Sequence, residues 1–306
     1  MTSTNAARTI KVGGEHEVGR VGLGAMRLTG EALWGPYPDH AAAVTFLQEA
    51  VQAGVTLIDT ADVYGPHTNE QLIHDALHPY PAALVIATKG GFVRGSREFS
   101  SIYAIGAPNY LRQAARLSAR RLGVERIDLY YLHSGGATDA PFEQQIETLA
   151  GLREEGVIGH IGLSNVSVQQ FHAARSITDI AAVTAHYNVV DRSNEPLLRA
   201  AEQAGAAFSP WQPISLIPPR DQHTDVNGPD RVRAVLEPIA KAREVKVSQI
   251  SLAWLLQASP SVVPIPGTTS IDHLCQNLAA LDITLTAEET ATIDRLGLHG
   301  SGDTDG

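Results

Sequence analysis

The chain has 306 residues, of which 43% are hydrophobic and 18% charged, and its formal net charge at pH 7 is −10. This composition excludes a mostly disordered chain, and the acidic excess argues against general binding to nucleic acids or anionic membranes, although a local anion site stays open. The single cysteine, Cys275, excludes an intramolecular disulfide and a four-cysteine zinc site. No apolar run reaches the ~20 residues that span a bilayer, and residues 1–7 lack the apolar core of a secretory signal, so we expect a cytoplasmic protein.

A short β-hairpin is expected first, because 9–12 and 17–21 flank the turn sequence Gly13-Gly14-Glu15-His16. After it, short runs rich in β-branched residues alternate with helical patterns. The eight expected strands are Val21–Gly24, Thr56–Asp59, Leu84–Lys89, Ile127–His133, His160–Ser164, Ala182–Tyr187, Ala206–Pro210 and Val262–Pro266.

The segments between these strands carry helical periodicity. Apolar residues at steps of three and four predict helices over His40–Ala53 and Asn109–Leu122, the second ending at Gly123 as a C-cap. Capping-box patterns begin at Ser167 and Thr286. We expect two further helices, over Val247–Gln257 before the last strand and over Ala287–Leu296 after it.

Eight strands alternating with helices predict a parallel sheet closed into a (β/α)₈ barrel, with the N-terminal hairpin and the extra C-terminal helices added to it. No linker or shift in composition divides the chain, so we expect one domain over residues 1–306, with a frayed tail at about 298–306. The long connections 90–108 and 211–229 are candidates for functional loops, because loops of this length are uncommon in compact domains.

Active-site groups of such barrels lie at the carboxyl ends of the strands. Successive predicted strands end in or near Asp59, Tyr64, Lys89 and His133. This set suits the reduction of a carbonyl group: an ammonium held by a carboxylate lowers the pKa of a tyrosine hydroxyl, which can then donate a proton, while a neutral histidine orients the carbonyl oxygen. The hydride must come from a cofactor, because no side chain supplies one. Taken singly, each residue also has a structural explanation, namely a helix cap, a packed aromatic ring or a core histidine.

Short motifs occur in order from about Gly19 to Asp294. They are Gly22-Leu23-Gly24, Ile58-Asp59-Thr60-Ala61-Asp62-Val63-Tyr64-Gly65, Thr88-Lys89, Leu132-His133, Ile161-Gly162-Leu163-Ser164-Asn165, Tyr187-Asn188, Phe208-Ser209-Pro210 and Ile265-Pro266-Gly267-Thr268. In this combination the chain resembles the aldo-keto reductase family. The resemblance implies an NADP(H)-dependent barrel enzyme that reduces a small aldehyde or ketone, with Asp59, Tyr64, Lys89 and His133 as its catalytic tetrad and Tyr64 as the acid.

The same resemblance implies a cofactor site. Ser164 and Asn165 would hold the nicotinamide carboxamide, and Phe208, in the Phe208-Ser209-Pro210 motif, would stack on the nicotinamide ring. The residues implied along the adenosine and its phosphates are the stretch Pro266-Gly267-Thr268-Thr269-Ser270, then Gln276 and Asn277.

Three positions depart from the family pattern. Thr184 stands where a glutamine usually supports the carboxamide, and its hydroxyl is too short to span the same gap. Gly267 and His273 stand where many relatives place a lysine and an arginine for the 2′-phosphate. This weakens the expected preference for NADP(H) over NAD(H) without reversing it.

Finer resemblance, in Gly24-Ala25-Met26-Arg27-Leu28 and Tyr64-Gly65-Pro66-His67, is to bacterial reductases of the pyridoxal-reductase type, so pyridoxal or another aromatic or small aldehyde is a candidate substrate. Two other functions stay open: a cofactor-binding regulatory or scaffold subunit with this fold, and a redox-neutral isomerase or dehydratase that retains NADP. A Rossmann fingerprint fails at Arg27, where the third glycine should be. No ligand cluster is visible among the twelve histidines, so no metal is expected.

Overall fold

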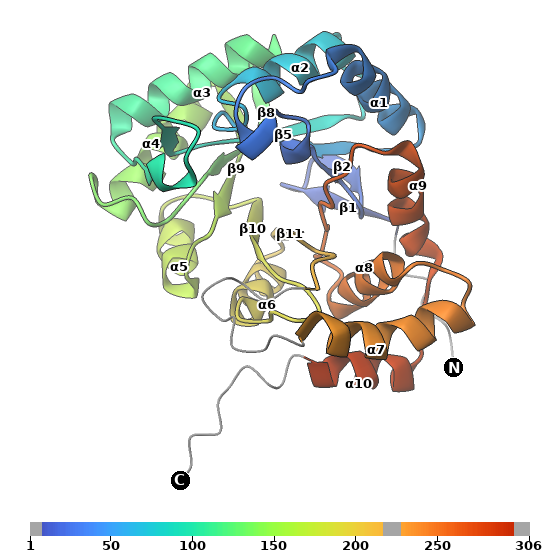
Figure 1. The fold of residues 1–306 in the computed structure, drawn as a ribbon. Coiled ribbons are helices and arrows are strands. Elements are labelled where there is room, and N and C mark those ends of the chain that lie inside the picture. The colour runs from blue at the N-terminus through green and yellow to red at the C-terminus, as the bar shows by residue number, and fades with distance from the viewer. Residues whose placement is uncertain (1–7, 217–227, 297–306) are drawn as a thin grey trace.

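A computed structural model describes residues 8–216 and 228–296, so the predicted frayed tail lies outside the described residues. Seven parallel strands form one curved sheet in the order β11-β10-β9-β8-β5-β4-β3, and the helices surround it (Figure 1). The strands are β3 (Leu23–Gly24), β4 (Leu57–Asp59), β5 (Val85–Gly90), β8 (Ile127–Leu132), β9 (Ile158–Ser164), β10 (Ala182–His186) and β11 (Ala207–Trp211). The predicted (β/α)₈ barrel is confirmed, with one irregular member.

The irregular member is the eighth predicted strand, Val262–Pro266, which lies between β11 and β3 and closes the barrel. Val263 and Ile265 donate their backbone N–H groups to β11 over 2.8 and 3.4 Å. The carbonyl oxygens of Pro264 and Pro266 accept over 3.0 and 3.2 Å from Gly22, just before β3, and from Gly24 at its end. The prolines have no N–H to return to β3, so half of the bonds of a regular ladder are missing on that side. The segment therefore pairs as a strand without forming a regular one.

The predicted hairpin is present as β1 (Thr9–Val12) and β2 (His16–Gly19), joined by a turn in which Gly13 and Gly14 adopt φ of 62° and 73°. Such positive φ values favour glycine. Val12 and Val18 are buried in one cluster with residues at the first positions of several barrel strands, Leu57, Val85, Ala182 and Ala207. The hairpin therefore covers the amino-terminal end of the barrel.

Helices pack outside the strands, and the predicted capping boxes at Ser167 and Thr286 are confirmed, as is the C-cap at Gly123. Within the described residues no helix is long and apolar enough to cross a membrane. The helices are α1 (His40–Gln52), α2 (Thr68–Leu77), α3 (Pro108–Leu122), α4 (Phe142–Glu154), α5 (Val168–Ile177), α6 (Glu195–Gln203), α7 (Gly228–Ala242), α8 (Val247–Ala258), α9 (Ile271–Ala279) and α10 (Ala287–Asp294).

The long connection 90–108 contains an antiparallel hairpin of β6 (Phe92–Arg94) and β7 (Ile102–Ala104), with a short 3₁₀ helix, η3 (Phe99–Ser101), between them. It follows β5 directly, so it lies at the carboxyl end of the barrel strands. Of the second long connection, 211–229, residues 217–227 lie outside the described part of the chain.

Candidate active site

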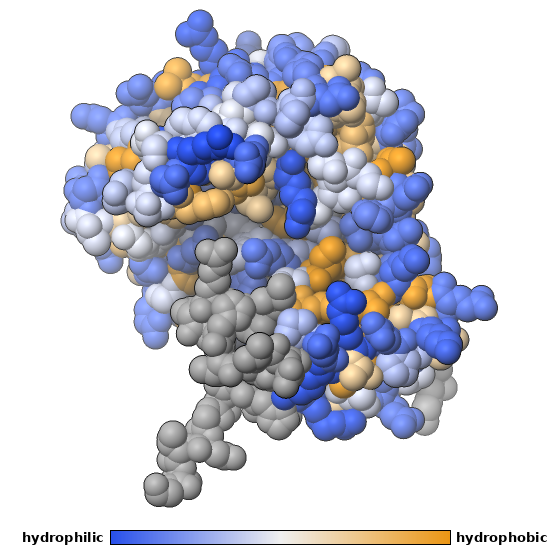
Figure 2. All heavy atoms as spheres, viewed as in Figure 1, coloured by the Kyte–Doolittle hydropathy of each residue, from blue (hydrophilic) through white to orange (hydrophobic). Residues whose placement is uncertain are grey.

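A cavity of about 570 Å³ opens at the carboxyl ends of the strands. The face drawn in Figure 2 is hollowed near its centre, with hydrophilic and hydrophobic residues around the rim. All four residues of the predicted tetrad line the cavity: Asp59 ends β4, Tyr64 lies in the loop before α2, Lys89 lies near the end of β5, and His133 directly follows β8. The fold thus brings together side chains that are far apart in the chain.

Lys89 and Asp59 form a buried ion pair in this cavity, with side-chain exposures of 4% and 6%. The Lys89 ammonium donates hydrogen bonds to Asp59 Oδ1 and, over 2.8 Å, to the carbonyl oxygen of Thr60. Its Nζ lies 5.4 Å from the centre of the Tyr64 ring. A lysine so deeply buried requires a charged partner, and Asp59 supplies it.

Burial by itself lowers the pKa of Lys89, but the negative charge of Asp59 and the Tyr64 side chain outweigh it and raise the pKa, so the ammonium stays charged. For Tyr64 the outcome differs from the sequence expectation. Burial raises the pKa of its hydroxyl above the ordinary value, and the Lys89 charge, which acts in the expected lowering direction, only partly offsets this. The free site therefore holds a protonated phenol beside a cation that stabilises its ionised form.

His133 is 7% exposed and packs against two rings, with centroid distances of 6.0 Å to Tyr64 and 4.6 Å to Phe92. Burial, reinforced by the Lys89 charge, holds its pKa well below the usual range, so the imidazole is neutral. Its Nδ1 is buried without a hydrogen-bond partner among the described residues.

Ser164, Asn165 and Thr184, which occupy the positions expected beside the nicotinamide carboxamide, also line the cavity. Asn165, with φ of 52°, donates from Nδ2 to Ser164 Oγ over 3.0 Å, and its Oδ1 accepts from Trp211 Nε1 over 3.1 Å. The Thr184 hydroxyl donates to the carbonyl oxygen of Ser209 over 2.7 Å. Its proton is therefore used within the protein.

Phe208, the ring predicted to stack on the nicotinamide, does not line the cavity. Phe208 is fully buried in the layer between strands and helices, 5.9 Å from the Tyr187 ring, and neither it nor Ser209 or Pro210 lines the cavity. Side chains of a strand alternate between its two faces, so Phe208 points outward while Trp211 faces the cavity. The cavity-lining residues are instead Trp211, Gln212 and Pro213, which directly follow the predicted motif.

Among the residues predicted along the adenosine, Gly267 lines the cavity. Thr268 and Thr269 lie in the loop that leads to α9, and the three others, His273, Gln276 and Asn277, lie on α9 itself and are respectively exposed, half-buried and buried. They form one stretch that leads away from the cavity.

The cavity residues that were not predicted include Phe92 on β6 and Arg27. Arg27 is exposed, and its side chain lies beside Gly267, where a Cβ added to the glycine would come within 3.6 Å of the arginine Cδ. The signal that could have pointed to Arg27 is its place in the motif Gly24-Ala25-Met26-Arg27, which continues directly from β3.

Residues 20–297 match the model of the aldo/keto reductase family. The chain belongs to the aldo/keto reductase family. This aldo/keto reductase is 39% identical to an uncharacterized oxidoreductase of Schizosaccharomyces pombe, over 95% of this chain and 90% of that protein. It is 36% identical to pyridoxine 4-dehydrogenase of Escherichia coli, over 92% and 96%. Among solved structures, an aldo-keto reductase of Klebsiella pneumoniae in complex with NADPH is 27% identical, with a TM-score of 0.77 and 94% of each chain covered.

Proposed function

We propose that this aldo/keto reductase reduces an aldehyde or ketone with NADPH, reversibly, and that Tyr64 is the general acid. The observation that carries the proposal is the Lys89–Asp59 ion pair beside Tyr64 and a neutral His133 in one cavity. A scaffold or sensor subunit gains nothing from a buried cation next to a proton donor, and burying that charge has a free-energy cost.

The cofactor, when bound, supplies the hydride. The protein's residues control the proton and the position of the substrate. The neutral imidazole of His133 orients the carbonyl oxygen, and the Tyr64 hydroxyl donates its proton to that oxygen as the carbon accepts the hydride. The phenolate that remains is stabilised by the Lys89 ammonium, which Asp59 holds in place, and it regains a proton from solvent.

The residues around the cavity fit a nicotinamide cofactor. Ser164 and Asn165 offer a hydroxyl and an amide to the carboxamide, and Trp211 offers an aromatic face to the ring. Thr268, Thr269 and the α9 residues would follow the adenosine. Arg27 supplies a cation beside Gly267, which compensates in part for the lysine that is absent there. NADP(H) is therefore the proposed cofactor, and NAD(H) is less favoured.

We propose pyridoxal or a similar aromatic aldehyde as the substrate. The similarity to pyridoxine 4-dehydrogenase supports this choice, as do the cavity walls, where Phe92, Met26 and Trp211 provide flat or adaptable apolar surface.

The experiment begins with fluorescence titrations of the protein with NADPH and NADH, followed by assays of NADPH oxidation with aldehydes and ketones that include pyridoxal. We expect tighter binding of NADPH and oxidation by at least the aromatic aldehydes. Binding without oxidation by any carbonyl would favour the scaffold function. Conversion of a substrate without net NADPH consumption would favour the redox-neutral enzyme.

Tyr64→Phe tests the acid directly. We expect kcat to fall by about 100-fold or more, the contribution typical of a positioned acid, with NADPH affinity unchanged. Tyr103→Phe is the matched control, because Tyr103 lies on β7 with 63% exposure and is absent from the cavity lining. Full activity of Tyr64→Phe would remove Tyr64 from its role.

A further inference from the structure

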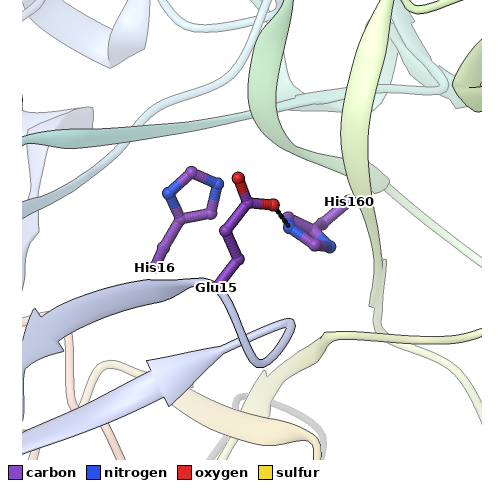
Figure 3. A group of neighbouring side chains, drawn as sticks. All are labelled: Glu15, His16 and His160. Atoms are coloured by element: carbon purple, nitrogen blue, oxygen red, sulfur yellow. Dashed lines mark hydrogen bonds and ion pairs between the residues drawn. The ribbon is translucent and has the colours of Figure 1, made fainter.

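A second group of chemically reactive side chains lies at the other end of the barrel. Glu15, His16 and His160 converge there, and each offers a ligand atom within 4.8 Å of the others (Figure 3). Glu15 and His16 belong to the hairpin turn and the start of β2, whereas His160 lies near the start of β9. Ser164, at the other end of β9, lines the catalytic cavity, so β9 separates the two sites.

One imidazole nitrogen of this group has no partner among the described residues, and another contacts Glu15. His16 Nε2 is buried and has no hydrogen-bond partner among the described residues. His160 Nε2 lies 3.2 Å from Glu15 Oε2, while the Nδ1 side of its ring is packed closely against Gly13. The two imidazole rings meet edge to face, with centroids 5.2 Å apart and an angle of 89°. A buried imidazole nitrogen without a partner has a free-energy cost, which a ligand would remove.

The charged groups around this cluster favour the binding of a cation. Glu15 Oε1 has Arg126 at 3.8 Å, and the half-buried Asp128 lies close enough to both His16 and Glu15 to sense their charges. Two carboxylates thus face one permanent positive charge. Because Glu15 is exposed and its contact with Arg126 is long, that contact holds the carboxylate only weakly.

We propose that Glu15, His16 and His160 bind a zinc ion. Imidazole nitrogen and carboxylate oxygen are ordinary zinc ligands at about 2.0–2.2 Å, and in the tetrahedral geometry of zinc two such ligands lie about 3.4 Å apart. The ligand atoms, which lie within 4.8 Å of one another, would therefore move closer by up to about 1.4 Å, and the hairpin turn that carries Glu15 and His16 is where this movement would occur. Three ligands leave the fourth position to water, and the ion would tie the hairpin to β9.

The test measures thermal unfolding of the full-length protein without an affinity tag, first treated with a chelator and then titrated with ZnCl₂. We expect one zinc ion per chain by calorimetric titration. At a free zinc concentration about 100 times Kd, the unfolding midpoint should rise by about 4 °C, as expected for a chain of this length. MgCl₂, a poor partner for imidazole, should leave the midpoint unchanged.

His16→Asn and Glu15→Gln should each weaken zinc binding by at least 10-fold, as judged by the zinc-dependent rise over each variant's own metal-free midpoint. His172→Asn and Glu17→Gln are the matched controls, an exposed histidine on α5 and an exposed glutamate on β2, and they should keep the full rise. A rise that persists in His16→Asn would overturn the proposal and direct attention to the histidines around Asp75 on α1 and α2, His40 and His74. Absence of any rise in the unaltered protein would also overturn it, and neither result would touch the proposed reductase activity.

Discussion

Lys89 meets Asp59 because β4 and β5 pair in parallel, with Asp59 opposite Ala87. Residues 87 and 89 share a face of β5. Lys89 therefore lies just past the end of β4, on the same face as Asp59, and its side chain contacts the Asp59 carboxylate. Both side chains are buried, and their pairing fixes the position of the ammonium next to Tyr64. The register of the two strands therefore sets the geometry on which the proposed proton transfer depends.

Asp59→Asn should destabilise the protein by about 3 kcal/mol, because it leaves a buried ammonium without its counter-ion. Asp282→Asn is a matched control: its partner is also a basic side chain, Arg8, but the two are 64% and 61% exposed, so the loss should stay below about 1 kcal/mol. Urea denaturation at pH 7 measures both. Equal losses in the two variants would contradict the importance of burial.

His133 should remain neutral when the pH falls below the ordinary histidine range, because burial and the Lys89 charge lower its pKa in the folded state. The unfolded chain binds a proton near pH 6.5, so this residue contributes stability above that pH and the contribution is lost as the pH falls below it. NMR titration of the imidazole measures its pKa, and stability measurements between pH 7 and 5 test the predicted loss of stability. A His133 resonance that titrates near pH 6.5 would contradict the predicted lowering of its pKa.

Trp211 and Phe208 should respond differently to truncation. Trp211→Ala should weaken NADPH binding by about 10-fold, through the lost aromatic face, with a small effect on stability. Phe208→Ala should lower the free energy of unfolding by about 3 kcal/mol, because its ring is fully buried between strands and helices, and it should leave cofactor affinity within a few-fold. Fluorescence titration and urea denaturation of both variants separate the roles, and the reverse pattern would support Phe208 as the stacking ring.

Asp191 should contribute to acid stability. Burial opposes its ionisation, but hydrogen bonds from His186, at 2.6 Å, and from Ser193 prevail and lower the pKa of Asp191 to about 2. Because this pKa lies below the unfolded value, the contribution of about 2 kcal/mol is present above pH ~4 and is lost as the pH falls toward 2. In Asp191→Asn the decline in stability between pH 4 and 2 should be shallower than in the exposed control Asp179→Asn.

The barrel could be predicted because each strand–helix unit carries its own signal, an apolar run followed by residues at helical spacing. The eighth strand was found in the same way, but its two prolines prevent regular pairing with β3, an effect that depends on which neighbour each residue faces. The three-residue displacement of the aromatic position has a similar origin, since Phe208 and Trp211 both follow the strand pattern and lie on opposite faces.

The sequence by itself determined the family and the order of strand-end residues, because both are encoded in short contiguous motifs. Tertiary structure alone decided the protonation of His133, through the burial of its ring, and the cavity-facing role of Trp211. It also decided the meeting of Glu15 with His160, which are 145 positions apart and share no motif. Burial and contacts between distant segments arise only when the chain is packed, so the chain spacing of histidines and carboxylates carried no sign of the proposed zinc site.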